Sequence, residues 1–249
     1  MATDDNEQNP FTRPGFIAAA VVVALVVVLG IVIAIVSATR SDDPDPAPEP
    51  STSSPTTSAA PTSEPSDVAG GASVCGLVEG QELTGTLSTA PNAEWAYQGT
   101  TAYPTSSEFG PGETTAGGVR YCFQHSPTGA LFMAANAITQ GSDPSISAEW
   151  VEYVYAPGPH REHLLSAGVA QETEGTRASI AGFRLLSYVG ESARVDLAVR
   201  ASTGGDTATL SAVYDLVWID GDWKVSTDTA QPLDVAAVPD IAGYVAWGE

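Results

Sequence analysis

One uninterrupted run of apolar residues near the amino end constrains this chain more than any other feature. The run, Phe16 to Val36, reads FIAAAVVVALVVVLGIVIAIV and contains no charged side chain. As an α-helix, these 21 residues would extend about 30 Å, which is the thickness of the hydrocarbon core of a bilayer. The run therefore predicts a single transmembrane helix over residues 16–36, preceded by a short cytoplasmic tail over residues 1–15.

A cleaved signal peptide is the competing interpretation of this run. Val36-Ser37-Ala38 has the small residues of a cleavage site. A signal peptide, however, has a basic segment in front of an apolar core of about 7–15 residues. Here three acidic residues and one base, Arg13, precede a longer core. The uncleaved transmembrane helix is therefore the favoured interpretation.

The residues that follow the apolar run predict a disordered linker over residues 37–72. Residues 41–72 contain seven of the 18 prolines of the chain, and Ser, Thr, Ala and Asp make up most of the remainder. Such a composition cannot bury enough apolar surface to fold. We expect the linker to hold an extracytoplasmic domain away from the membrane surface, on the cell-wall side. A disordered linker on the cytoplasmic side is the alternative, because Arg13 and Arg40 flank the run almost symmetrically.

Residues 73–249 are predicted to form one exported α+β domain. The domain contains both cysteines of the chain, Cys75 and Cys122. An even number of cysteines in an exported domain predicts a disulfide between them, and two separate buried thiols are the alternative. The domain is acidic, with 21 Asp and Glu against seven Arg and Lys. This charge argues against nucleic acid as a partner, because phosphate binding requires clustered basic side chains.

The middle of this domain predicts helices, and its first part predicts strands and loops. Ser126 and Pro127 are typical of a helix start, since Ser caps free amides and Pro suits the first turn. The expected helices cover residues 128–140, 147–155 and 160–168. Before them, strands are expected at residues 94–102 and 118–124, with a long loop at residues 104–118 that is rich in Pro, Ser and Gly.

The last third predicts an antiparallel sheet. In residues 193–201 apolar and polar side chains alternate, which is typical of a half-buried strand. Asp220-Gly221 lies between Trp218 and Trp223 and predicts a tight hairpin turn. Strands are expected at residues 180–189, 193–201, 208–220 and 223–227. Helices packed on one face of such a curved sheet define the α+β class.

Few residues are candidates for chemistry. His160 and His163 have a spacing that suits two metal ligands, but no third ligand is evident. His125 follows Cys122 closely enough to suggest a nucleophile pair, which a disulfide would exclude. The acidic residues, including Asp196 and Asp222, are best interpreted as solvated faces and turns. We therefore predict no catalytic residue, no metal and no cofactor.

Four side chains are candidates for a partner or cavity surface. Arg194 and Arg200 share a strand face with Asp196, where they could form cross-strand ion pairs or line the concave side of the sheet. Trp218 and Trp223 flank the predicted turn, where closing the core is the favoured role and an exposed aromatic patch is the sharper alternative. The sequence does not separate these roles.

Two segments carry a resemblance to known proteins. VWIDGDWKVSTD (Val217 to Asp228) resembles the last two strands of nuclear-transport-factor-2-like, or cystatin-like, domains. RYCFQHSPTGAL (Arg120 to Leu131) resembles predicted conjugation-element proteins of high-GC Gram-positive bacteria. With the span and linker, the plan is similar to that of the bitopic scaffold subunits of conjugation and type IV secretion machines. Unlike the usual curved-sheet domain, this one begins with about 50 residues of strand and loop.

The resemblance implies a non-enzymatic scaffold subunit in the cell membrane that binds other membrane or secretion-machine subunits. Self-association into a homo-oligomer stays open, because the span has no pair of glycines typical of helix dimers. The alternative is an accessory subunit of a lipid-import system of the mammalian-cell-entry type, which would have an apolar cavity. A third alternative is an isomerase-like or small-molecule-binding domain, which as an enzyme would need a histidine beside an acid in that cavity.

Overall fold

The structure, a computed structural model, describes residues 72–78, 80, 85–167, 177–203 and 206–249. The predicted cytoplasmic tail, transmembrane helix and most of the linker lie outside the described residues. Within the described part of the chain, no helix is long and apolar enough to cross a membrane. The predicted transmembrane helix over residues 16–36 therefore stays a prediction from the sequence.

The described domain combines three helices with antiparallel strands, which confirms the α+β class. The helices are α2 (Pro127–Ser142), α3 (Ser147–Val154) and α4 (Arg161–Ala167). The strands are β1 (Glu94–Gln98), β2 (Thr101–Thr105), β3 (Glu113–Thr114), β4 (Arg120–Tyr121), β5 (Arg177–Tyr188), β6 (Ser192–Thr203), β7 (Asp206–Ile219), β8 (Asp222–Val225), β9 (Leu233–Val238) and β10 (Val245–Ala246).

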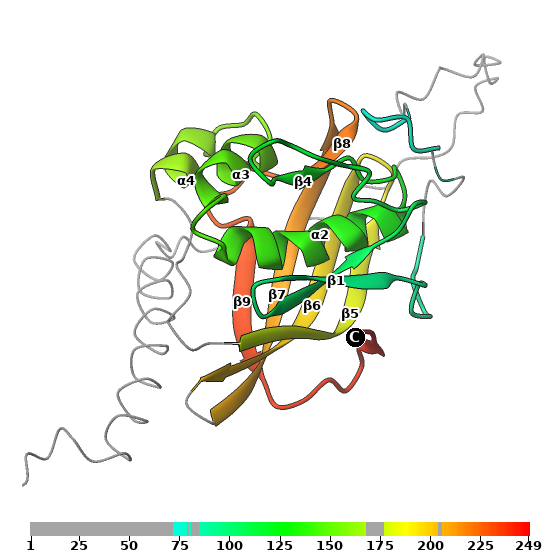
Figure 1. The fold of residues 1–249 in the computed structure, drawn as a ribbon, viewed down its shortest axis with the longest axis vertical. Helices are drawn as coiled ribbons and strands as arrows, with labels where there is room; N and C mark the ends of the chain where they lie inside the picture. The colour runs from blue at the N-terminus through cyan, green and yellow to red at the C-terminus, as the bar shows by residue number, and fades with distance from the viewer. Residues whose placement is uncertain (1–71, 79, 81–84, 168–176, 204–205) are drawn as a thin grey trace, which may run out of the picture. The chain divides into compact units, whose positions relative to one another are not determined.

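The main sheet is built on a meander of the long strands β5, β6 and β7, to which shorter strands add. Its order is β10-β5-β6-β7-β8 (Figure 1). Strand β9 also pairs with β7, along a part of β7 that precedes the part paired with β8. All of its pairs are antiparallel. Register shifts interrupt the β5–β6 pair at Ile180/Gly182 and Leu185/Ser187, and such bulges increase the bend and twist of a sheet.

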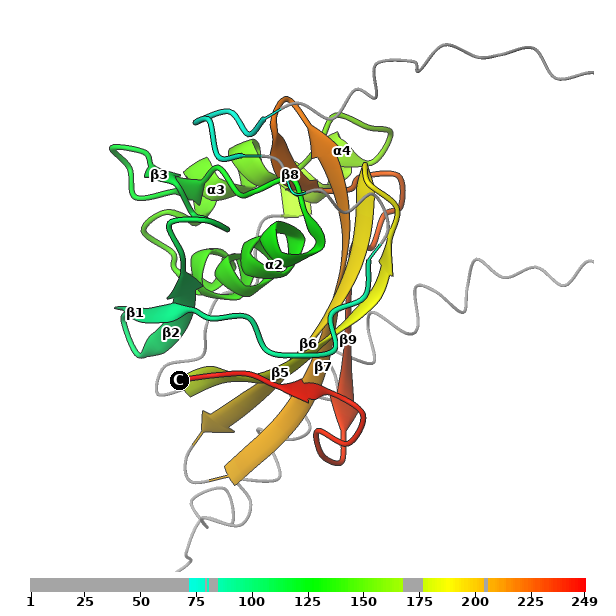
Figure 2. The same cartoon turned by 90° about the vertical axis from the view of Figure 1, so that its right-hand side faces the viewer.

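The sheet bends around α2, which lies against its concave face (Figure 2). Nearly every residue of α2 is buried, as its almost uniformly apolar sequence predicts. The Ser126 side chain accepts a hydrogen bond from the Gly129 amide at 3.0 Å, so the predicted helix cap is confirmed. Val195 and Leu197 of β6 meet α2 in the core.

The first part of the domain differs from the sequence prediction. The single strand expected at residues 94–102 is two strands, because Gly99 adopts a φ of +60° and turns the chain between β1 and β2. The long loop expected at residues 104–118 contains the end of β2 and all of β3. The β1–β2 hairpin packs against α2 and β5.

The carboxyl-terminal segment adds strands to the sheet and packs side chains on both of its faces. Strands β9 and β10 were not expected from the sequence, and both extend the sheet. Tyr244 lies over Arg184 of β5, with the guanidinium carbon 4.2 Å from the ring centroid. Trp247 enters the core, where it contacts Trp95, Phe132 and Phe183.

Candidate functional site

A disulfide joins Cys75 to Cys122 and anchors the first described segment to the body of the domain. The two Cα atoms are 6.0 Å apart. The predicted disulfide is therefore confirmed, and the alternative of two separate thiols is wrong. The bond also consumes the thiol of the Cys122–His125 pair that we considered as a nucleophile.

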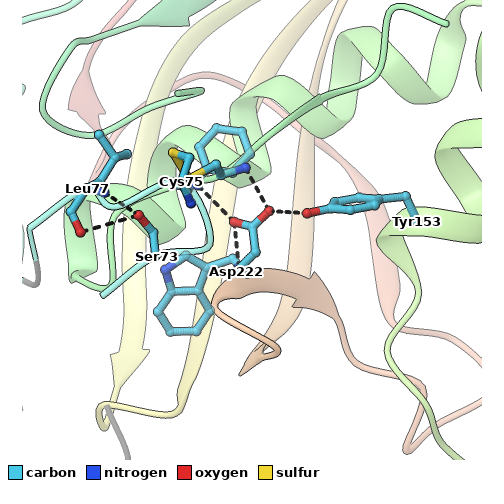
Figure 3. Close-up of a disulfide and its surroundings, with 8 residues drawn as sticks. Ser73, Cys75, Leu77, Tyr153 and Asp222 are labelled. Carbon is cyan, nitrogen blue, oxygen red and sulfur yellow. Dashed lines mark hydrogen bonds between the residues drawn. A yellow bond between two sulfur atoms is a disulfide. The ribbon is translucent and has the colours of Figure 1, made fainter. Parts of the chain in front are cut away.

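Beside this disulfide lies the buried carboxylate of Asp222 (Figure 3). It accepts hydrogen bonds from the amides of Cys122 and Phe123, both at 2.8 Å, and from the Tyr153 hydroxyl at 2.7 Å. Asp222 is placed there by the turn between β7 and β8. Asp220 and Gly221 have φ values of 54° and 75°, which a type I′ turn requires.

Asp222, Tyr153, Lys224 and the amides that donate to Asp222 form a tightly packed group, which we call the Asp222 cluster. Burial raises the pKa of Asp222, while the hydrogen bonds from Phe123, Tyr153 and Cys122 oppose that rise. The Lys224 ammonium lies 3.0 Å from the Tyr153 ring centroid, and burial lowers the pKa of Lys224 to about 8. The cavity at this cluster is only about 10 Å³, roughly the smallest space that holds one water. These groups therefore hold the fold together and leave no room for a substrate.

A second buried network surrounds Arg120. Its guanidinium donates to Asn136 and Thr139 of α2, both at 2.8 Å, and to Gln98 at the end of β1 at 2.6 Å. It also lies 3.7 Å over the Tyr103 ring. Burial lowers the pKa of Arg120. Every one of these contacts joins the β1–β2 hairpin or α2 to β4, so Arg120 is a structural connector.

A mostly apolar hollow opens at the end of α2, between that helix, α3 and the β7–β9 side of the sheet. Its volume is about 310 Å³, within the range of small-molecule sites in proteins, about 300–1,000 Å³. The lining residues are Ala137, Ile138, Gly141, Ser142, Trp150, Tyr155, Tyr214, Val225, Pro232 and Leu233. None of these side chains is charged.

Tyr155 and Tyr214 are the main polar groups of this hollow. Tyr214 projects from β7 and is 4% exposed, and Tyr155 follows α3. Within the described part of the chain, neither hydroxyl has a hydrogen-bond partner. Burial raises the pKa of both tyrosines, and the neighbouring Tyr155 raises that of Tyr214 further. Both hydroxyls are thus neutral donors at physiological pH.

The two predicted arginines lie on the convex face of the sheet, opposite α2. Arg194 and Asp215 face each other across β6 and β7 and form an ion pair at 3.3 Å. This placement agrees with the cross-strand alternative for Arg194 and not with the concave one. Arg200 lies exposed on the same strand.

Trp218 and Trp223 lie in the core, so the favoured interpretation holds and the alternative of an exposed aromatic patch is corrected. Their exposed fractions are 7% and 1%. The two rings contact each other edge to face at 5.5 Å between centroids. The reason is their register, because Trp218 and Trp223 form a directly opposed pair of β7 and β8 on the face that packs against the helices.

His160 and His163 lie in one helical turn at the start of α4, and His125 lies in the core. His125 is buried and stacks on Trp218, with ring centroids 4.2 Å apart. His163 of α4 is exposed. In the described ranges, no three His, Cys, Asp or Glu side chains are grouped as metal ligands would be.

Two carboxylates differ from the sequence interpretation of solvated faces and turns. Asp196 is fully buried on the convex face, where Ser211 donates to it at 2.7 Å and Tyr244 at 2.9 Å, and Arg184 pairs with it. Asp222 is equally buried. Tyr244 covers Asp196 from a segment about 50 residues later, which no local pattern announces. For Asp222, the two flanking tryptophans were a usable signal of burial.

Sequence reasoning also missed the hollow. Tyr214 lies within the strand expected at residues 208–220, but no sequence pattern indicated which residue faces it across the core. Tyr155 was the expected last residue of a helix. The two come together only because Tyr155 bridges to Val225 of β8, next to β7.

The fold and the hollow together define a class: a disulfide-linked α+β domain in which a curved antiparallel sheet encloses a buried helix. More particularly, the chain belongs to the family described as a domain of unknown function, DUF8175, whose pattern matches residues 43–246. No curated protein and no solved structure has a significant match to the chain.

Proposed function

We propose that the chain is a membrane-anchored, non-enzymatic scaffold subunit of a conjugation or secretion machine. The predicted span over residues 16–36 anchors it, and the extracytoplasmic domain binds partner subunits. The disulfide between Cys75 and Cys122 supports an extracytoplasmic location, since disulfides persist in oxidising compartments.

One observation carries the docking role: β9 is an edge strand of the described sheet. Among the described strands, β9 pairs only with β7, so its other side pairs with none of them. Its sequence LDVAAV carries one charge, Asp234, and four of its residues are exposed: Leu233, Asp234, Ala236 and Ala237. Natural proteins usually protect such edges with Lys, Pro or covering segments, because an open edge pairs with other chains. A partner strand at β9 would use this edge.

Crosslinking of the tagged full-length chain in native membranes, followed by pull-down and mass spectrometry, tests the proposal. We expect channel subunits and conjugative ATPases among the products. Ala236→Lys, which places a charge on the β9 edge, should weaken those crosslinks. Thr207→Lys, on an exposed position of β7, is the matched control and should leave them intact. A chain that always purifies alone contradicts the proposal.

An accessory subunit of a lipid-import system is the second candidate, because the hollow beside Tyr214 is apolar. The same pull-down separates the two, since this candidate requires lipid-transport components among the partners. An isomerase-like function receives no comparable support: the described residues that line the hollow include neither a histidine nor a carboxylate.

A further inference from the structure

We propose that the hollow at the end of α2 is a binding site for a neutral, mostly apolar small molecule that accepts a hydrogen bond from Tyr155 or Tyr214. This inference goes beyond the docking role, because it needs no partner subunit. It rests on the lining, the two hydroxyls and the volume of the hollow.

The lining selects an apolar body. Its walls come from apolar side chains of α2, α3, β8 and β9, among them Ile138, Trp150 and Leu233. Sites of this kind bind ligands by removing apolar surface from water. Among the described residues, the lining has no Lys, Arg or His that could bind an anionic group. A phosphate or carboxylate buried there would lack a counter-charge, so nucleotides and phosphorylated sugars are excluded.

The two tyrosines select a hydrogen-bond acceptor. A hydroxyl in a mostly apolar hollow favours a ligand that can accept its hydrogen bond. Tyr214 is 4% exposed as a whole residue and lines the hollow, and its hydroxyl oxygen is not among the fully enclosed atoms that lack a partner, so the space of the hollow reaches it. Because burial raises the pKa of both tyrosines, they remain protonated and donate. A carbonyl, ether or hydroxyl oxygen of a ligand would accept a hydrogen bond from these hydroxyls.

The volume limits the size. A space of about 310 Å³ is at the small end of the range for small-molecule sites, about 300–1,000 Å³. The fitting ligand is therefore a short acyl or isoprenoid segment, or one or two aromatic rings, with one oxygen. The same chemistry is available from the tail of a membrane lipid and from a free apolar metabolite.

Benzophenone is a suitable probe, because it is neutral, has two aromatic rings and one carbonyl, and crosslinks to nearby C–H bonds under ultraviolet light. The full-length protein in phosphatidylcholine nanodiscs is titrated with benzophenone and irradiated, and the modified residues are mapped by mass spectrometry. We expect saturable labelling at Ile138, Leu233 and their neighbours in the hollow.

Three variants make the labelling diagnostic. Removing both hydroxyls with Tyr155→Phe/Tyr214→Phe keeps the shape of the hollow. It should raise the half-saturating concentration about tenfold, the usual effect of losing a hydrogen bond. Ala137→Leu should abolish saturable labelling by filling the space. Tyr97→Phe removes a hydroxyl that donates to Glu249 outside the hollow and should change nothing. Thermal unfolding of each variant checks that it is folded.

The source of the natural ligand follows from lipid extraction of the unlabelled protein. A lipid that co-purifies with wild type, is absent from folded Ala137→Leu and competes with benzophenone identifies a membrane lipid. A wild-type protein that carries no lipid but labels saturably identifies a free small molecule. Labelling spread over the surface, or labelling unchanged in the double tyrosine variant, would overturn the proposal. Partner crosslinks do not enter this readout, so it fails or succeeds separately from the docking role.

Discussion

Removing the disulfide is the perturbation whose effect is most directly calculated from this fold. The double variant Cys75→Ala/Cys122→Ala opens a loop closed across 47 positions. In the chain-entropy treatment, a loop of that length constrains the unfolded chain by about 4 kcal/mol. The free energy of unfolding should fall by about that amount. In a domain of this size, the melting temperature should fall by about 8–16 °C.

Tryptophan fluorescence measures this loss in the full-length protein in detergent. All five tryptophans lie between residues 95 and 247, so the signal reports the domain and not the predicted span. Urea titrations of wild type and the double variant give the two free energies. Wild type in excess reductant is the control and should approach the variant. Two thiols that react freely with an alkylating reagent in untreated protein, or a loss below about 1 kcal/mol, would refute the reasoning.

Three further predictions use the same fluorescence assay. Asp222→Ala leaves three amides and the Tyr153 hydroxyl without their acceptor, so it should cost at least about 3 kcal/mol. Asp215→Ala, which breaks an exposed ion pair, should cost less than about 1 kcal/mol, and equal losses would contradict the buried role. The pKa of Lys224 in the folded protein is about 8, below its ordinary value of 10.5. Between these two pH values, the unfolded state therefore binds more protons than the folded state. Stability therefore rises with pH from about 8 to 10, and Lys224→Met should lack that rise; equal slopes in both proteins would show that Lys224 is not buried. Ser126→Ala removes the acceptor for the Gly129 amide and should cost about 1 kcal/mol, and no measurable loss would argue against this cap.

Regular local patterns made the second half of the domain predictable. Strict alternation placed β6 and β7 within a few residues, since one buried face imposes a period of two. The Ser126-Pro127 pair located the start of α2, and Asp220-Gly221 located the hairpin. Each of these signals is local, because the physical cause and the residues that show it lie within one element.

The parts that the sequence did not predict depend on contacts between distant residues. Strand β9 has no clear alternation, and it forms because β7 is long enough to pair with both β8 and β9. Asp196 is buried only because Tyr244 reaches it. The hollow likewise needs Tyr155 and Tyr214, which lie 59 positions apart in the sequence, to meet beside α2. Burial of polar groups in such places is a property of the tertiary fold.

The position of Trp247 has a consequence for how the domain matures. Its ring contacts Trp95 and Phe132, and its indole N–H donates to the carbonyl of Pro91 at 3.1 Å. The earliest and latest parts of the domain thus share one core. If the domain is exported, as we propose, chain up to Phe132 that has already crossed the membrane must wait for Trp247 before its core can close. During that interval its apolar surfaces stay exposed, which makes the translocating chain a substrate for extracytoplasmic chaperones and proteases.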